Sequence, residues 1–170
     1  MTRRAALGVA LALLLVGCSD PGSRRSPPNV PSTPSAHRVP AVVTRVVDGD
    51  TAHMRVDGRD VDVRFIGIDT PETVAPDQPI ECYGPQASAY TERRLEGRRV
   101  ELEFDVERED RYGRTLAYVW LGDELFNETL VRDGYALVTT FPPDVRYVDR
   151  FVAAQGDARR HDRGLWGACP

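Results

Sequence analysis

The chain has 170 residues, of which 41% are hydrophobic, and this is enough for one folded domain and too little for two large ones. Its 22 basic residues are outnumbered by 26 acidic residues, so the formal net charge is −4. This balance excludes a histone-like or polybasic binder that neutralises phosphates over its whole surface. Any nucleic acid must therefore be held by a few arginines in one site.

The N-terminus is typical of a bacterial export signal. Two arginines precede residues 5–16, an apolar run that is too short to cross a bilayer as a helix. The run leads into Leu-Val-Gly-Cys at 15–18, which resembles the lipobox in which the cysteine is lipidated and becomes the mature N-terminus. We therefore expect residues 1–17 to be a lipoprotein signal peptide and Cys18 to anchor the exported protein to a membrane. An ordinary cleaved signal followed by an incidental cysteine is the alternative.

Residues 18–40 are rich in proline and serine and contain almost no apolar side chains. Such a segment cannot bury enough surface to offset its chain entropy, so we expect a disordered or polyproline-like tether. Its role would be to hold a folded domain, residues 41–170, away from the membrane surface.

The folded segment begins with three predicted strands that are separated by Asp-Gly turns. Residues 41–47 are β-branched, and residues 51–56 alternate between apolar and polar side chains. Residues 61–65 place their apolar side chains on one face and Asp62 and Arg64 on the other.

The middle of the chain alternates between predicted loops and regular elements. Residues 67–80 form a loop with several prolines, and residues 85–96 form a helix that a proline opens and a glycine ends. Alternation predicts a fourth strand over 99–105. A charged loop, 108–113, separates it from a fifth strand over 115–121.

Two more helices are expected near the C-terminus. Asn127 suits the N-cap of a helix over 127–133 that ends at Gly134, and residues 147–162 form a helix that ends at Gly164. Five strands with one helix between the third and fourth predict an α+β domain. Its layout resembles the OB-fold, a five-stranded barrel, here with three helices. A five-stranded α+β domain of another topology remains open on this evidence.

Two further cysteines remain in the expected mature domain. An even pair in an exported protein predicts a disulfide between Cys82 and Cys169, and two free thiols are the alternative. The chain has no Cys-x-x-Cys motif or Cys/His cluster, so a zinc site is not expected.

Polar side chains stand where the predicted strands stop. Asp50 lies in the first turn and Asp69 in the loop after the third strand, and such carboxylates suit a hard cation such as calcium. Arg64 and Arg114 suit a phosphodiester, because a planar guanidinium can hold two phosphate oxygens. Glu72 is the candidate carboxylate that orients or deprotonates water.

Each of these features has a structural explanation when taken alone. Asp-Gly-Asp at 48–50 is good turn chemistry that needs no metal, and residues 69–72 form a plausible capped turn. Arg64 beside Asp62 fits a surface ion pair. Residue types alone therefore indicate only a possible phosphate site beside a cation.

The combination of motifs resembles the staphylococcal nuclease (thermonuclease) family. The similarity continues through 116–119, 127–132 and 165–166 and covers nearly all of residues 41–170. Its main blocks are Val-Asp-Gly-Asp-Thr at 47–51, Arg-Phe-Ile-Gly-Ile-Asp-Thr-Pro-Glu at 64–72, Tyr-Gly-Pro-Gln-Ala-Ser-Ala at 83–89 and Asp-Arg-Tyr-Gly-Arg at 110–114.

The resemblance implies a five-stranded barrel with three helices that hydrolyses DNA and RNA with calcium and leaves 3′-phosphates. By position, it assigns Asp50 and Asp69, with the carbonyl of Thr70, to the calcium ion. It assigns Glu72 to the attacking water, and Asp48 to the surroundings of the metal.

The resemblance also assigns substrate contacts. Arg64 and Arg114 fall on the positions that bind the phosphate of the transition state, and Arg111 and Tyr112 on positions that contact the terminal phosphate of a bound nucleotide. Where the family has two tyrosines against the nucleotide, Phe141 is the stacking ring of this chain. We expect a monomer whose partners are nucleic acid and a membrane.

The two cysteines depart from the family pattern. Cys82 and Cys169 replace ordinary residues of the family, which supports a disulfide particular to an exported branch.

Two other functions compete with a nuclease. One is a catalytically silent OB-fold module that binds nucleic acid or a protein partner at the cell envelope, and the other is a structural envelope lipoprotein. A silent module should lack Asp50, Glu72 or one of the two arginines, whereas this chain has all of the candidate residues.

Overall fold

The computed structural model describes residues 37–73 and 79–170. The expected signal peptide, Cys18 and most of the expected tether lie outside the described residues. Within them, no helix is long and apolar enough to span a bilayer. The elements in chain order are β1 (Arg38–Val46), β2 (Thr51–Val56), β3 (Arg59–Phe65), β4 (Ile68–Asp69), α1 (Gly84–Leu95), β5 (Arg99–Glu103), β6 (Thr115–Leu121), β7 (Glu124–Leu125), α2 (Phe126–Arg132), β8 (Leu137–Val138), α3 (Val148–Arg160) and α4 (Leu165–Ala168).

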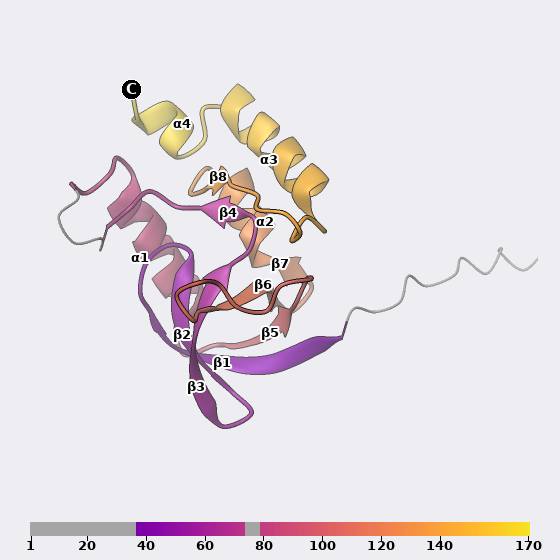
Figure 1. Ribbon diagram of the computed structural model, residues 1–170. Coiled ribbons are helices and arrows are strands. Elements are labelled where there is room, and N and C mark those ends of the chain that lie inside the picture. The colour runs from indigo at the N-terminus through magenta and orange to yellow at the C-terminus, as the bar shows by residue number, and fades with distance from the viewer. Residues whose placement is uncertain (1–36, 74–78) are drawn as a thin grey trace, which may run out of the picture. The chain divides into compact units, whose positions relative to one another are not determined.

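Five of the strands close into a barrel, as expected. β1 pairs with β2 and β5, β2 pairs with β3, and β5 pairs with β6, all of them antiparallel. The parallel pairing of β3 with β6 joins the two ends of this order and closes the ring (Figure 1). The closed ring, together with the helices around it, confirms the predicted α+β fold with an OB-like barrel.

The core forms because alternate side chains of each strand point into the barrel. In β3, Val63 and Phe65 are buried, and Met54 of β2 and Leu102 of β5 meet them in the same core. Burying a side chain of this size contributes about 1.5–3 kcal/mol relative to leaving it in water. Phe126 of α2 packs edge-on against Phe65, which ties the helical layer to the barrel.

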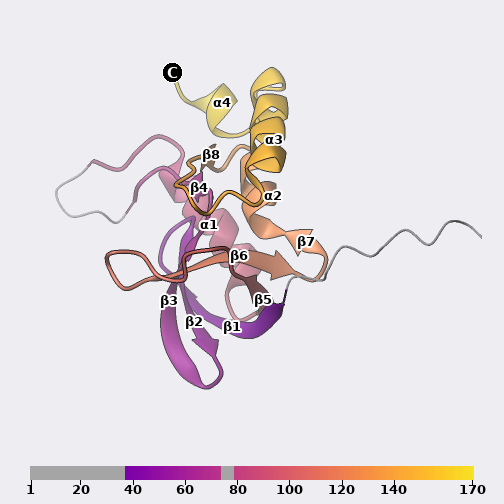
Figure 2. The ribbon, with the colours of Figure 1, turned by 45° about the vertical axis from the view of Figure 1, so that its right-hand side comes forward.

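The helices cover one side and one end of the barrel. α1 lies beside β1, whereas α2, α3 and α4 lie at the end away from the β2–β3 hairpin, which is plain in both views (Figures 1 and 2). The expected third helix, residues 147–162, is observed as α3, and α4 follows it as a separate short turn of helix.

Asn127 is not the N-cap that the sequence suggested. Helix α2 begins one residue earlier, at Phe126, and Asn127 is completely buried inside it. Its side-chain oxygen accepts the N–H of Val119 at 2.9 Å, and its amide nitrogen donates to the carbonyl of Ile66 at 2.9 Å. The residue therefore bonds to the barrel and not to its own helix.

The first strand also begins earlier than expected. Residues 38–40 were assigned to the tether, but they pair with β5 from the register Arg38↔Glu103 onward. The guanidinium of Arg38 lies 3.5 Å from the centroid of the Trp120 ring and 3.8 Å from the buried Glu103 carboxylate. These contacts offset the entropy of ordering the strand start, so the folded region extends three residues into the expected tether.

Candidate active site

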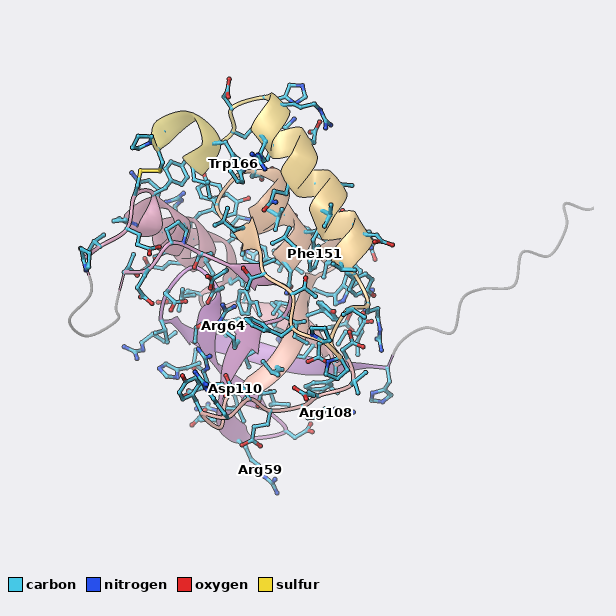
Figure 3. The ribbon with its side chains drawn as sticks, turned by 45° about the horizontal axis from the view of Figure 1, so that its top comes forward. Arg59, Arg64, Arg108, Asp110, Phe151 and Trp166 are labelled. Carbon is cyan, nitrogen blue, oxygen red and sulfur yellow. A yellow bond between two sulfur atoms is a disulfide. The ribbon has the colours of Figure 1, made fainter. Side chains whose placement is uncertain are left out.

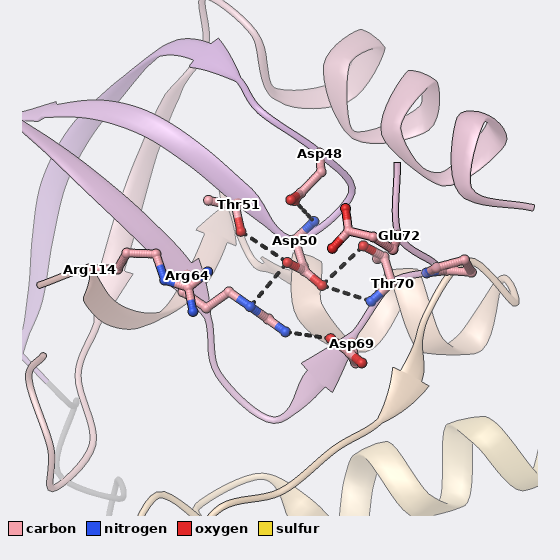
Figure 4. Close-up of a pocket in the computed structure, with 9 residues that line it drawn as sticks. Asp48, Asp50, Thr51, Arg64, Asp69, Thr70, Glu72 and Arg114 are labelled. Carbon is pink, nitrogen blue, oxygen red and sulfur yellow. Dashed lines mark hydrogen bonds and ion pairs between the residues drawn. The ribbon is translucent and has the colours of Figure 1, made fainter. Parts of the chain in front are cut away.

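Nine residues from separate segments of the barrel line one cavity of about 210 Å³ (Figure 4). They come from the turn between β1 and β2, from the neighbouring strands, from β4 with the residues after it, and from the position that precedes β6. The lining residues are Asp48, Asp50, Thr51, Arg64, Asp69, Thr70, Pro71, Glu72 and Arg114. All the catalytic and metal-binding candidates of the sequence analysis are among them.

The turn between β1 and β2 is held by its own side chains and by α1. The N–H of Asp50 donates to the Asp48 carboxylate at 3.0 Å, and the hydroxyl of Thr91 on α1 donates to the carbonyl of Gly49 at 2.7 Å. A Cβ atom at residue 49 would lie 2.7 to 2.8 Å from three side-chain atoms of Thr70. Glycine is therefore what lets Thr70 approach the turn.

Asp50 is the most enclosed acid of the cavity, with only 4% of its surface exposed. One carboxylate oxygen accepts the Thr51 hydroxyl at 3.1 Å and lies 3.2 Å from Nε of Arg64. The other accepts the N–H of Thr70 at 2.7 Å and its hydroxyl at 3.0 Å. This network fixes the direction of the carboxylate and satisfies the charge in a buried place.

Arg64 bridges two carboxylates of the cavity. Its Nε faces Asp50, and its Nη2 lies 2.7 Å from a carboxylate oxygen of Asp69. Its Nη1 donates to the carbonyls of Phe65 and Ile68, both at 2.9 Å. The guanidinium is held at three nitrogens, with 16% of the side chain exposed. The main-chain carbonyls of Phe65 and Ile68 thus help to hold the positive charge of Arg64 at the cavity.

Asp69 is placed by a small sheet that the sequence did not predict. β4 pairs with β8 in the registers Ile68↔Val138 and Asp69↔Leu137, and Gln155 of α3 accepts the N–H of Val138 at 2.8 Å. Two-residue strands carry no periodic signal, so the expected loop 67–80 hid this pairing. The C-terminal helices thereby support the cavity without lining it.

Glu72 follows β4 on a segment that lies against the start of α1. Its carboxylate accepts the N–H of Thr73 at 2.8 Å. A Cβ atom at Gly84 would lie 2.9 Å from the carbonyl oxygen of Glu72 and 3.0 Å from that of Pro71. The helix start and the Glu72 backbone are therefore in direct contact, which sequence reasoning did not detect.

Arg114 enters the cavity from the strand that closes the barrel. The parallel register Arg64↔Leu116 puts Arg114 two positions before the partner of Arg64, so both side chains project from the same face. The carboxylate of Asp110 accepts Nε of Arg114 at 2.8 Å and pairs with its Nη2 at 2.7 Å. Asp110 also accepts the N–H groups of Tyr112 and Arg114. Asp110 opens the Asp-Arg-Tyr-Gly-Arg block at 110–114, but its support of Arg114 becomes visible only in the structure.

The cavity carries more negative charge than its arginines offset. Burial, followed by the neighbouring Asp50 charge, raises the pKa of Asp48 to about 6. The same two causes raise the pKa of Asp69, with smaller additions from Glu81 and Glu72. Crowded carboxylates of this kind favour a bound cation.

The side chains of the cavity supply only part of the oxygen ligands that a calcium ion would need. In the described part of the chain, no group of three or more His, Cys, Asp or Glu side chains is arranged to hold a metal. Asp50 and Asp69 supply two carboxylates that already share one cation, the Arg64 guanidinium. Calcium accepts backbone carbonyls and waters as well as carboxylates, so the predicted carbonyl of Thr70 and solvent would complete its shell.

The predicted nucleotide contacts lie outside the cavity lining. Tyr112, the predicted phosphate contact, and Phe141, the predicted stacking ring, are 67% and 74% exposed, so a ligand can reach both side chains. The guanidinium carbons of Arg111 and Arg114 lie 4.7 and 5.5 Å from the centroid of the Tyr112 ring. Tyr112 therefore connects Arg111 with the cavity, whereas no described contact joins Phe141 to it.

The expected disulfide is present. Cys82 precedes α1 and Cys169 follows α4, and their Sγ atoms are bonded, with the Cα atoms 5.9 Å apart. The bond joins the start of α1 to the C-terminal turn of helix (Figure 3).

Comparison with known proteins adds a family to this geometry. A family model described as staphylococcal nuclease homologue matches residues 62–168. The chain is 47% identical over 124 residues to a thermonuclease of Staphylococcus hyicus, which covers 73% of each protein. It is 48% identical over 125 residues to a thermonuclease of Staphylococcus intermedius, which covers 74% of each. It is also 34% identical over 130 residues to endonuclease YncB of Bacillus subtilis (strain 168), which covers 75% of this chain and 62% of that protein.

Proposed function

The chain belongs to the staphylococcal nuclease family and is a hydrolase of nucleic acid phosphodiester bonds, and we propose that it works with calcium and leaves 3′-phosphates. The observation that carries the proposal is the convergence of two aspartates, a glutamate and two arginines on one cavity (Figure 4). A catalytically silent binding module has no need of this complete set.

We assign the calcium ligands to Asp50, Asp69 and the carbonyl of Thr70. When bound there, calcium would supply positive charge to a non-bridging phosphate oxygen. Thr51 and the N–H of Thr70 fix the direction of the Asp50 carboxylate before a cation arrives. Asp48 lies in the same cavity and adds negative charge near the cation.

Arg64 and Arg114 bind the scissile phosphate in this proposal. Charge on the phosphate oxygens grows as water adds to phosphorus, and two fixed guanidinium groups stabilise it most at that stage. Asp110 holds Arg114 at both Nε and Nη2, and backbone carbonyls hold Arg64. Their placement before substrate arrives is what makes them useful in the transition state.

Glu72 orients and deprotonates the attacking water. It lines the cavity together with Asp50, Thr70 and the two arginines. A carboxylate is a suitable base because water loses a proton as its oxygen bonds to phosphorus. The bond from phosphorus to the 5′ oxygen of the next nucleotide breaks in the same reaction, and that oxygen takes a proton from solvent and leaves as a 5′-hydroxyl. Outside the cavity, Arg111, Tyr112 and Phe141 would contact the rest of the nucleotide.

The test is hydrolysis of a single-stranded DNA oligonucleotide by the purified protein. We expect cleavage with added calcium, its loss in excess chelator, and products that a 3′-phosphatase alters. The Glu72→Gln variant should lower kcat by about 100-fold or more. Full activity in chelator would contradict the calcium assignment, and unchanged turnover of Glu72→Gln would contradict the role of Glu72.

We further propose that the protein is exported and anchored by a lipid on Cys18. The basis is the lipobox-like sequence at 15–18 and the Pro/Ser-rich segment that follows it. A labelled fatty acid should be incorporated into the protein in cells and should be absent from the Cys18→Ser variant. Labelling that is unaffected by this substitution would contradict the proposal.

A further inference from the structure

We propose that Glu81 is a positioning residue for Glu72, and that the Cys82–Cys169 disulfide holds Glu81 in that role. The inference rests on the proposed function of Glu72. It adds a second glutamate, which lies outside the cavity lining, and a covalent link to the C-terminus of the chain.

Glu81 forms hydrogen bonds with both backbone groups of Glu72, its N–H and its carbonyl. Its carboxylate oxygen Oε2 accepts the N–H of Glu72 at 3.0 Å, and its own N–H donates to the Glu72 carbonyl at 3.0 Å. These two bonds fix the peptide planes before and after the Glu72 Cα atom. The direction in which the Glu72 side chain leaves the backbone therefore depends on Glu81.

Glu81 is itself attached to the start of α1. Its carbonyl accepts the N–H of Gly84 at 3.1 Å, and the absence of a side chain at Gly84 lets the helix lie against the Glu72 carbonyl. A second link joins the two segments, because the hydroxyls of Thr73 and Ser88 are 3.2 Å apart. The segment that carries Glu72 is thus held by contacts with α1 as well as by the barrel.

The disulfide connects the residues before α1 to the C-terminal region. Cys82 follows Glu81 directly and is bonded to Cys169, while the N–H of Leu165 donates to the carbonyl of Gly134 at 2.8 Å and so docks α4 on the fold. Next to the bond, the ring of Tyr83 stacks on Tyr135 at 5.5 Å. Both contacts restrain the residues that directly follow Glu81.

The first experiment separates a hydrogen bond from a charge effect. Glu81→Ala removes the acceptor and the charge, whereas Glu81→Gln removes only the charge and keeps an acceptor oxygen. We expect Glu81→Ala to lower kcat by about 10- to 100-fold with little change in KM, since a small misplacement of a reacting group is this costly. Glu81→Gln should restore most of kcat, and the exposed Glu92→Ala on α1 is the matched control.

Three results would overturn the proposal. Equal losses in Glu81→Ala and Glu81→Gln would show that Glu81 acts through its charge, which also reaches Asp69. Glu81→Ala turnover equal to that of Glu92→Ala would show that Glu81 does not position Glu72. A rise in KM without a fall in kcat would indicate a substrate contact instead.

The second experiment tests the disulfide. We expect the double variant Cys82→Ser/Cys169→Ser to lower kcat by about fivefold or more at a temperature where circular dichroism shows it folded. The triple variant that adds Glu81→Ala should lose little more activity than Glu81→Ala alone, because both changes release the same segment. Fully multiplicative losses, or a folded double variant with wild-type kcat, would contradict the link. If Glu72→Gln loses activity but Glu81→Ala and the cysteine double variant do not, this inference is refuted and the proposed function stands. If Glu72→Gln keeps wild-type turnover, the proposed role of Glu72 is itself refuted.

Discussion

Replacing Arg64 by alanine should raise the affinity of the cavity for calcium and at the same time lower turnover. The guanidinium lies 3.2 Å from Asp50 and 2.7 Å from Asp69, the two carboxylates that we assign to calcium. A divalent cation must therefore compete with this positive charge. Because Arg64 is also a proposed phosphate ligand, its loss should slow hydrolysis. A variant that merely unfolds would lose both properties.

The size of the effect follows from the two ion pairs. A pair of unit charges about 4 Å apart contributes about 1 kcal/mol in a water-like environment, which suits Asp69, whose side chain is 54% exposed, and is a minimum for Asp50, whose side chain is 6% exposed. Two pairs give about 2 kcal/mol, which corresponds to about a 30-fold decrease in the Kd for calcium. Loss of the phosphate contact should lower kcat by about 100- to 1,000-fold.

Calorimetric titration with calcium, without nucleic acid, would measure the first effect, and an oligonucleotide cleavage assay the second. Arg64→Lys keeps the charge but lacks the planar fork, so we expect calcium affinity near that of the wild type with slow turnover. The exposed Arg59 of β3, replaced by alanine, controls for the change in net charge. If Arg64→Ala binds calcium no more tightly than Arg59→Ala, calcium does not share the Asp50 and Asp69 carboxylates.

Two further predictions concern stability. Asn127→Ala should lower the free energy of unfolding by about 3–5 kcal/mol, because two buried backbone groups lose their only described side-chain partner; urea denaturation measures this, and a loss below about 1 kcal/mol would be inconsistent with it. Replacing both Cys82 and Cys169 by serine should cost about 4–5 kcal/mol, since the bond spans 87 positions and restricts the unfolded chain. Equal denaturation midpoints with and without the bond would contradict that estimate.

The barrel was predictable because β2, β3 and β5 alternate apolar and polar side chains, and β1 and β6 are short runs rich in apolar residues. β6 was expected over 115–121 and is observed over Thr115–Leu121. The short strands β4 and β8 were missed because two residues have no period. Their pairing depends on contacts between segments far apart in the sequence, and these leave no local trace.

Asn127 shows how a local rule can give way to packing. An asparagine at the start of an apolar helix is typical of an N-cap, yet two barrel backbone groups need a polar partner in the core and Asn127 supplies it. The helix starts instead after Leu125, without a capping side chain.

The candidate site was predictable as a set of residues but not as a supported structure. The family motifs pointed to Asp50, Arg64, Glu72 and their neighbours, and the structure brings them together in one cavity. The residues that hold them, Asp110 and Glu81, lie in charged or proline-flanked loops where acidic side chains are ordinary. Only their contacts distinguish them, and those contacts require the closed fold.

The parallel pairing of β3 with β6 also decides when the protein can act. Arg64 and Arg114 belong to segments that come together only when these two strands join, and no other strand pairing of the described barrel brings both to the cavity. A chain emerging from the ribosome, or one held open by a chaperone, therefore contains every reactive group without an assembled catalyst. Hydrolysis of nucleic acid therefore requires the paired β3 and β6 strands, and the unfolded chain should not cleave it.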